Sequence, residues 1–352
     1  MTPQHPEFRL TRPGSLIAAL PAVLGFIPEK SLVVVSLEED GRIGAVMRAD
    51  LSADLESNLG RLAEIAASSG AQTVVAVIVD ADGALCPMCN DSHRQLCETL
   101  AAELAEHHVG LYAGHVVDRV EAGGHWQCVD GCGSAGTIED PTASPLAAAA
   151  VLDGRRLYAR RADLHAVIES VDPASTAPLV KAIQERAVTR DADWQTDPDD
   201  RGRRDVQHAI AVAARVLDGA RPADTDIAEL ACSLTDVAVR DTLYALAVGS
   251  EAAAAEALWA LLARTLPEPW RVEALVLLAF SAYARGDGPL AGISLEAALR
   301  SDPEHRMAGM LDTALQSGMR PEQIRELAGT GYRLAKRLGV RLPPRRAFGR
   351  AG

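Results

Sequence analysis

The chain has 352 residues, of which 48% are hydrophobic and 24% are charged, and its net charge at neutral pH is −13. This composition is typical of a folded globular protein and excludes a wholly disordered chain. The negative charge argues against binding of nucleic acid or of an acidic membrane over the whole surface. The length is sufficient for two domains.

The N-terminal region has no apolar segment behind a basic start, so we expect no secretory signal. The most apolar early stretch, residues 15–28, contains two prolines and is too short to span a membrane. We therefore expect a cytoplasmic protein that does not enter a membrane. Structural disulfides are rare in that reducing compartment, so clustered cysteines there indicate metal ligands or redox thiols.

Strand and helix patterns alternate in the first half of the chain. Apolar, β-branched runs predict strands, the first two joined as a hairpin, and leucines at helical spacing predict two helices. The predicted strands are residues 31–37, 42–51, 73–80 and 111–118. The first helix covers residues 54–70, and the second begins at Asn90 or Asp91. This order predicts an α/β fold: a mostly parallel sheet with flanking helices and an antiparallel hairpin.

The second half predicts an all-helical, repeat-like domain, since no convincing strand pattern follows residue 144. In the segment 276–305, the small residues Ala279, Ala291 and Ala298 have the spacing of a tetratricopeptide-type helix pair. The charged, turn-rich stretch 190–206 indicates a surface connection. The predicted parts are an α/β domain with a cysteine-bearing flap over 1–180, a charged connection over 181–206, a helical domain over 207–338 and a basic tail over 339–352.

Four of the six cysteines form two close pairs, Cys86 with Cys89 and Cys128 with Cys132. Such spacing allows two thiolates to bind one tetrahedral metal, so the pairs predict a structural zinc site. His93 and His125 are alternates for one of the sulfur ligands. In this interpretation the metal ties the loop 81–90 to the hairpin that follows residue 118.

Two other interpretations of these cysteines remain open, namely unligated thiols and a thiol–disulfide function. A redox Cys-x-x-Cys motif normally opens a helix, and the expected helix start at Asn90 or Asp91 leaves Cys86 outside it. Cys97 and Cys232 lie in apolar helical patterns and are expected in the core. The Gly131–Gly136 stretch spells G-x-G-x-x-G, but no helix pattern follows it, so we reject a dinucleotide site.

Acidic residues follow three of the predicted strands and are weak candidates for catalysis. Asp80 and Asp118 are expected at the carboxyl edge of the sheet, where α/β proteins usually bind ligands, and Asp50 ends another strand. Arg48 is a candidate for contacting an anionic substrate. The competing interpretation, that each aspartate caps the turn that follows it, is the more common case.

After Glu326 the chain carries seven basic residues and no acidic one. Such a tail can contact nucleic acid or an acidic partner, although basic tails are more often simply solvated. Nucleic-acid binding is therefore not expected except through this tail.

Residues 15–51 resemble the opening of an uncharacterised actinobacterial family, domain of unknown function 4192. The features that carry the resemblance are Pro21, Leu24–Phe26, Pro28, Ser31–Val34, Arg48 and Asp50–Leu51. The later segment "HWQCVDGCGSAG", with Trp126 and Cys128, is similar to that family's second signature, except that Cys132 stands alone where a pair of cysteines is expected. The resemblance brings no activity with it.

The leading hypothesis for the function is a zinc-stabilised protein-interaction module, in which the helical domain holds a protein partner. The alternative is a small-molecule enzyme that uses the acidic residues at the carboxyl edge of the sheet.

Overall fold

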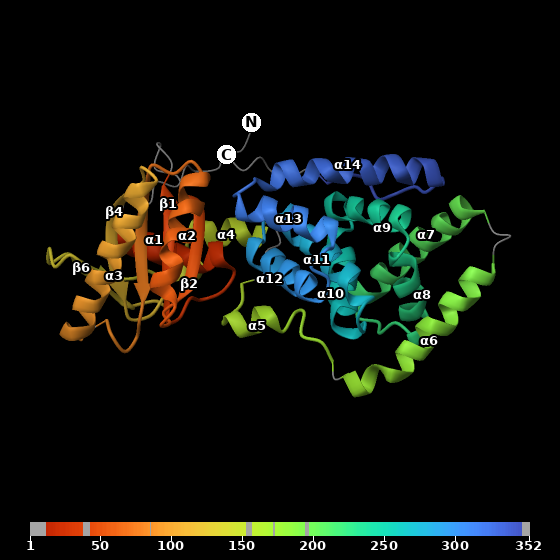
Figure 1. Ribbon diagram of the computed structural model, residues 1–352, viewed down its shortest axis with the longest axis horizontal. Coiled ribbons are helices and arrows are strands. Elements are labelled where there is room, and N and C mark those ends of the chain that lie inside the picture. The colour runs from red at the N-terminus through yellow and green to blue at the C-terminus, as the bar shows by residue number, and fades with distance from the viewer. Residues whose placement is uncertain are drawn as a thin grey trace. The chain divides into compact units, whose positions relative to one another are not determined.

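The computed structural model describes residues 12–37, 43–84, 86–152, 157–171, 173–193 and 197–346. The chain forms two compact units, Met1–Arg161 with Gln316–Gly318, and Ala162–Leu315 with Met319–Gly349 (Figure 1). The predicted domain boundary at residue 180 falls inside the helix Pro173–Ala192. The division between the two units follows Arg161 and therefore lies earlier in the chain than expected. No helix in the described ranges is long and apolar enough to cross a membrane.

The first unit contains a six-stranded sheet whose strand order is β2-β1-β3-β4-β5-β6. The strands are β1 (Ser31–Leu37), β2 (Ile43–Asp50), β3 (Thr73–Val79), β4 (Gly110–Val117), β5 (His125–Cys128) and β6 (Ala135–Thr137). The first four were expected from their apolar runs, and β5 lies in the hairpin expected after residue 118, whereas β6 was not predicted. With only three residues, β6 is too short to show a pattern.

The prediction of a mostly parallel sheet is wrong, because β3 and β4 are the only parallel pair among the described strands. As expected for two strands joined by a helical crossover, β2 and β3 run in the same direction. They are not neighbours, however, because β1 lies between them and pairs antiparallel with each. The sequence pattern determines each strand but not which strand lies between two others.

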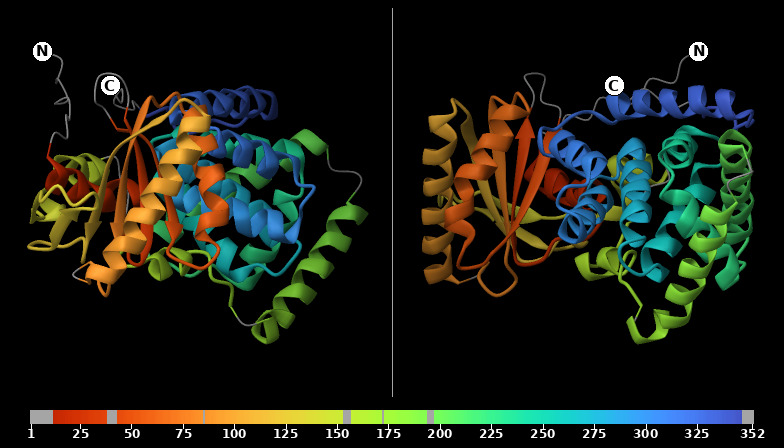
Figure 2. Two further views of the ribbon diagram at one scale, coloured as in Figure 1. Left: turned by 60° about the vertical axis from the view of Figure 1, so that its left-hand side comes forward. Right: turned by 45° about the vertical axis from the view of Figure 1, so that its right-hand side comes forward.

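Helices cover both faces of this sheet (Figure 2). They are α1 (Pro13–Leu24), α2 (Leu55–Ser68), α3 (Pro87–Glu106), the 3₁₀ turn η1 (Pro141–Ala143) and α4 (Pro145–Leu152). The apolar sides of α2 and α3 pack on one face, where Leu59 and Leu100 meet Val34 and Ile78 in a buried core. Helix α1 lies on the opposite face and is buried along nearly its whole length.

The second unit is helical throughout its described part. Its elements are α5 (Arg161–His165), α6 (Pro173–Ala192), α7 (Pro198–Leu217), α8 (Asp224–Leu234), α9 (Val237–Leu243), η2 (Tyr244–Val248), α10 (Ala252–Thr265), α11 (Arg271–Arg285), α12 (Gly288–Ser301), α13 (Arg306–Gln316) and α14 (Pro321–Leu338). The predicted helix pair is present as α11 and α12, joined at Gly286 in the left-handed conformation, with Ala279, Ala291 and Ala298 fully buried. Its membership of the tetratricopeptide class remains a prediction.

The connection predicted over 181–206 is wrong for most of its length, because α6 and α7 occupy it. Helix α7 begins at Pro198, and the Asp197 side chain accepts hydrogen bonds from the backbone N–H groups of Asp199 and Asp200. An aspartate before a proline is a strong helix-start signal. The high charge of this stretch therefore reflects solvated helix surface rather than a loop.

The first part of the predicted basic tail is bound to the helical unit. The backbone N–H of Ser250 donates to the carbonyl of Pro344, and that of Arg346 donates to the carbonyl of Val248. The Arg345 guanidinium stacks 4.8 Å from the ring centre of Tyr332. The backbone of this segment is therefore docked, although Arg341, Arg345 and Arg346 remain exposed to solvent, and residues 347–352 lie outside the described ranges.

Candidate functional site

Two cysteines and an aspartate come together in the turn between β5 and β6. The sulfur atoms of Cys128 and Cys132 and a carboxylate oxygen of Asp130 all lie within 4.8 Å of one another. Gly131 and Gly133 both have positive φ angles, of 73° and 83°, and this backbone conformation is accessible chiefly to glycine. The Asp130 carboxylate also accepts a hydrogen bond from the backbone N–H of Cys132, which lowers its pKa.

A buried histidine lies beside this turn. His115 on β4 pairs with Cys128 across the sheet, and its Nδ1 atom is 3.5 Å from the Cys128 sulfur. Burial lowers the pKa of His115, so its ring is neutral at physiological pH and can accept a proton or a metal. Burial, and then the side chain of Cys132, raise the pKa of Cys128 to about 11.

Of the four cysteines predicted to bind one zinc ion, only Cys128 and Cys132 belong to this group. Among the described residues, Cys128, Asp130 and Cys132 form the only group of three or more such side chains with ligand atoms within 4.8 Å. Cys86 and Cys89 are not part of it. The loop that carries them does fold toward β5 as expected, because the Gln127 side chain donates a hydrogen bond of 2.8 Å to the Ala84 carbonyl.

The predicted alternates are likewise engaged elsewhere. The His93 ring is 3.1 Å from the Asp80 carboxylate. His125 has an exposed side chain, and its ring lies 3.8 Å from Asp118. Neither histidine belongs to the group in the 128–132 turn.

Cys86 and Cys89 lie at the start of α3, three residues earlier than the sequence predicted. Cys86 has the extended backbone of an N-cap residue, its carbonyl accepts the first helical hydrogen bond from Asn90, and Pro87 occupies the first helical position. Proline is favoured there because its missing N–H would have no helical partner. The predicted helix start at Asn90 or Asp91 is therefore wrong, because α3 begins at Pro87 and Cys86 lies directly before it as the N-cap residue.

The two thiols of this motif have opposite electrostatic environments. The backbone N–H and the side chain of Cys89 favour the Cys86 thiolate, so the pKa of Cys86 is lowered. The pKa of Cys89 is raised, first by the side chain of Cys86 and then by desolvation. The Asp80 charge opposes ionisation of both thiols.

The acidic candidates share one edge of the sheet, as the register shows. Ser31 at the start of β1 pairs with Asp50 on one side and with Val79, next to Asp80, on the other. The backbone N–H of Asp80 donates to the carbonyl of Val117, so Asp118 follows at the same edge.

Each of these carboxylates already has a local partner. Asp118 accepts hydrogen bonds of 2.7 Å from the backbone N–H groups of Arg119 and His125, so it caps the turn after β4. Asp50 is bonded to Arg48, which lowers its pKa, and lies 3.3 Å from Arg161. The turn-capping interpretation therefore accounts for Asp118, and an ion pair accounts for Asp50 and Arg48.

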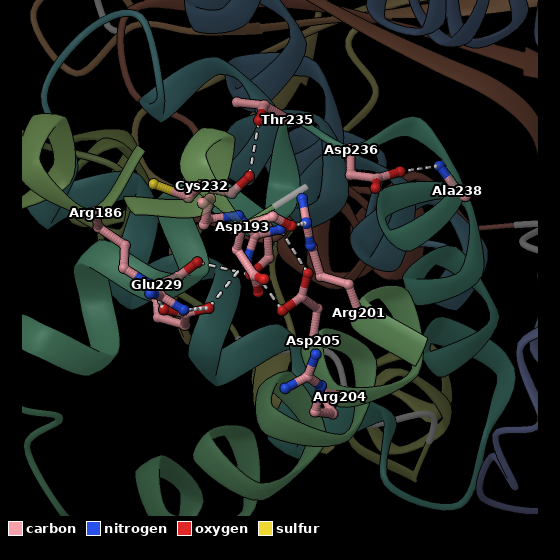
Figure 3. A network of polar contacts seen from close by, with 12 residues as sticks. Arg186, Asp193, Arg201, Arg204, Asp205, Glu229, Cys232, Thr235, Asp236 and Ala238 are labelled. Atoms are coloured by element: carbon pink, nitrogen blue, oxygen red, sulfur yellow. Dashed lines mark hydrogen bonds and ion pairs between the residues drawn. The ribbon is translucent and has the colours of Figure 1, made fainter. Parts of the chain in front are cut away.

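A network of ion pairs in the helical unit was not predicted from the sequence. Arg186 binds both carboxylate oxygens of Glu229, and Arg190 binds Asp205 through two contacts and Glu229 through a third (Figure 3). These contacts join α6 to α7 and α8. They line a cleft of about 390 Å³ whose wall also includes Arg201 and Arg204.

The signal for this network was weak in the sequence. The residues that bind one another lie 15 to 43 positions apart on three helices, and the sequence predicts a charged surface connection over 181–206 in place of these parts of α6 and α7. Helical spacing would have placed Arg186 and Arg190 on one face of α6. Their acidic partners are decided only by the packing of the three helices.

Residues 13–322 match the family described as Domain of unknown function (DUF4192). The chain belongs to this family. The match extends from α1 to the start of α14, so the DUF4192 domain includes elements of both compact units. The family match therefore covers most of the chain, beyond the resemblance described for residues 15–51. No curated protein and no solved structure matches the chain.

Proposed function

We propose that this DUF4192 protein is a metal-stabilised interaction module and that the turn 128–132 holds a zinc ion. The observation that carries the proposal is the close group of two sulfurs and one carboxylate oxygen in that turn. Thiolate, carboxylate and imidazole are the ligands that zinc takes in proteins. His115 is positioned beside Cys128 to supply a fourth ligand.

A zinc ion at this position requires only a small contraction of the turn. Zinc–sulfur bonds are about 2.3 Å and zinc–oxygen bonds about 2.0–2.2 Å, so the ligand atoms must approach one another by roughly 1 Å. Metal binding would fasten the β5–β6 turn to β4. Because the ligands lie in one short turn and the strand beside it, the binding free energy would stabilise this edge of the sheet.

The test is the metal content of the full-length protein by mass spectrometry, with variants that separate two ligand sets. Cys128→Ser, Cys132→Ser and Asp130→Asn should each lower the zinc content from about one ion per chain. Cys86→Ser and Cys89→Ser should leave it unchanged. Zinc loss in the latter pair would favour the four-thiolate site instead, and metal-free protein from a zinc-replete preparation would reject both.

A protein partner for the helical unit is the second part of the proposal. Its support is the exposure of large apolar side chains on two helices, where Met310 on α13 is 58% exposed and Leu327 on α14 is 42% exposed. Methionine adapts readily to partner surfaces. Capture from native cells with the wild-type chain and with Met310→Gln or Leu327→Gln tests this. A partner retained equally by all three would place the contact elsewhere.

The alternative of a small-molecule enzyme has one supporting observation, the shared edge of Asp50, Asp80 and Asp118. The engagement of Asp118 in backbone capping and of Asp50 in an ion pair weighs against a free catalytic pair. The metal-stabilised module is therefore the better-supported function.

A further inference from the structure

The start of α3 combines features that go beyond a metal-stabilised module. Cys86 is the N-cap residue, and Cys89 is the third residue of the helix. Both thiols are free and partly accessible, and Met88 between them is 81% exposed. We propose that Cys86 and Cys89 form a redox-active dithiol that reduces accessible disulfides in other molecules.

The geometry supports the formation of an internal disulfide. Residues three apart at the start of a helix face the same side, and the side chains of Cys86 and Cys89 interact directly. A helix N-terminus carries partial positive charge and unpaired N–H groups, both of which stabilise an anion. In Cys-x-x-Cys oxidoreductases the first cysteine has this position.

The two cysteines differ in the way that such chemistry requires. The helix N-terminus favours the thiolate at Cys86, which makes Cys86 the attacking thiol. Cys89 lies inside the first turn of the helix and is the resolving thiol. A thiol that attacks and a second thiol held protonated beside it are the two parts of an exchange reaction.

An acid–base pair lies next to the dithiol. Asp80 follows β3, and its charge reaches both cysteines. Its carboxylate is 3.1 Å from Nε2 of His93, a residue that is only 7% exposed. His93 lies one helical turn beyond Cys89, and its buried Nδ1 has no hydrogen-bond partner within the described chain. In this proposal the pair takes the proton from Cys89.

The reaction proceeds in two balanced steps. The Cys86 thiolate attacks one sulfur of the substrate disulfide, forming a mixed disulfide and releasing the other sulfur as a thiolate. Cys89, losing its proton, then attacks the Cys86 sulfur, forms the Cys86–Cys89 disulfide and releases the second substrate thiolate. Two electrons pass from the protein to the substrate, and both released thiolates take up protons. A low-molecular-weight thiol regenerates the dithiol by the reverse exchange.

The experiment uses the full-length reduced protein and oxidised glutathione as the probe. After timed exposure and acid quenching, peptide mass spectrometry should locate a Cys86–Cys89 disulfide that forms and disappears reversibly with the glutathione ratio. Cys89→Ser should trap glutathione on Cys86. Cys86→Ser should prevent the disulfide while keeping the helix cap, since serine is a favoured N-cap residue.

Matched variants make the outcome specific. Cys97→Ser and Cys232→Ser remove the two buried thiols and should leave formation of the Cys86–Cys89 disulfide unchanged. Cys86 should react faster than Cys132, since thiolate character controls the attack. Asp80→Asn should slow resolution of the mixed disulfide without preventing its formation.

Three results would overturn the dithiol proposal. The first is glutathione trapped on Cys132 in preference to Cys86 in the Cys89→Ser variant. The second is an absence of the Cys86–Cys89 disulfide at every glutathione ratio. Zinc lost on mutation of Cys86 or Cys89 would also overturn it, in favour of ligation. Failure of the zinc turn alone, with the disulfide still formed, would leave the dithiol proposal standing.

Discussion

Replacement of Gly331 by alanine should destabilise the helical unit, although alanine is the better helix former. Gly331 is buried in α14 where this helix crosses α9 and η2. A Cβ atom there would lie 2.8 Å from the carbonyl oxygen of Thr242, 2.9 Å from that of Asp241 and 2.8 Å from Cβ of Ala245. Two of these three atoms belong to backbone, so no side-chain rotation relieves the overlap.

The magnitude follows from two opposing effects. Exchange of glycine for alanine inside a helix gains about 1 kcal/mol. Overpacking of a buried contact costs about 1–3 kcal/mol and sometimes more, and a clash with backbone belongs at the upper end because the whole helix must move. We expect a net loss of about 2 kcal/mol in the free energy of unfolding, or roughly 4–8 °C in Tm for a unit of this size.

Gly309→Ala in α13 is the matched control. This glycine is also inside a helix, but a Cβ atom there would have no neighbour within 4 Å. The control should therefore gain about 1 kcal/mol from helix propensity alone. Chemical and thermal unfolding of both variants measure the difference. If Gly331→Ala were as stable as the wild type or more stable, the close crossing of α14 over α9 and η2 would be refuted.

Three further changes test other contacts of the helical unit. Ala291→Leu overpacks the fully buried crossing of α11 and α12 and should cost about 1–3 kcal/mol; a melting curve like that of the wild type would contradict the tight helix pair. Removal of residues 340–352 deletes three hydrogen bonds, one to the carbonyl of Pro344, one from the N–H of Arg346 and one from Tyr332 to the carbonyl of Pro343. At about 1 kcal/mol for each bond, the free energy of unfolding should fall by roughly 3 kcal/mol. An unchanged Tm would show that the segment is not docked. Burial acts to raise the pKa of Glu229, but the hydrogen bonds and charges of Arg186 and Arg190 together outweigh it, so the pKa lies below its ordinary value. The stability that this carboxylate contributes is therefore full at neutral pH and is lost as the pH falls through its folded pKa. The stability difference between wild type and Glu229→Gln should shrink in acid, and a difference that grew instead would contradict the ion pair.

The candidate sites depended on contacts that no local pattern reveals. The cysteine spacing indicated two thiol pairs, and the structure places Asp130 and His115 beside one of them, because the glycines of the turn and the register of β4 with β5 bring them there. The start of α3 was misplaced because the first strong leucine periodicity begins after Asn90. The proline that follows Cys86 was a helix-start signal in its own right.

The sequence by itself determined the elements whose signal is local: the strands from their apolar runs, α2 from its leucine spacing and Gly70, and the α11–α12 pair from its small residues and the glycine between them. These follow from the conformational preferences of residues close together in the chain. Tertiary structure alone decided that β1 separates β2 from β3, that Arg190 reaches Asp205 and Glu229, and that residues 340–346 bind beside η2. Each of these joins segments far apart in sequence, and their pairing is selected by the burial of whole faces and the satisfaction of buried charge, which are properties of the packed molecule and not of any one segment.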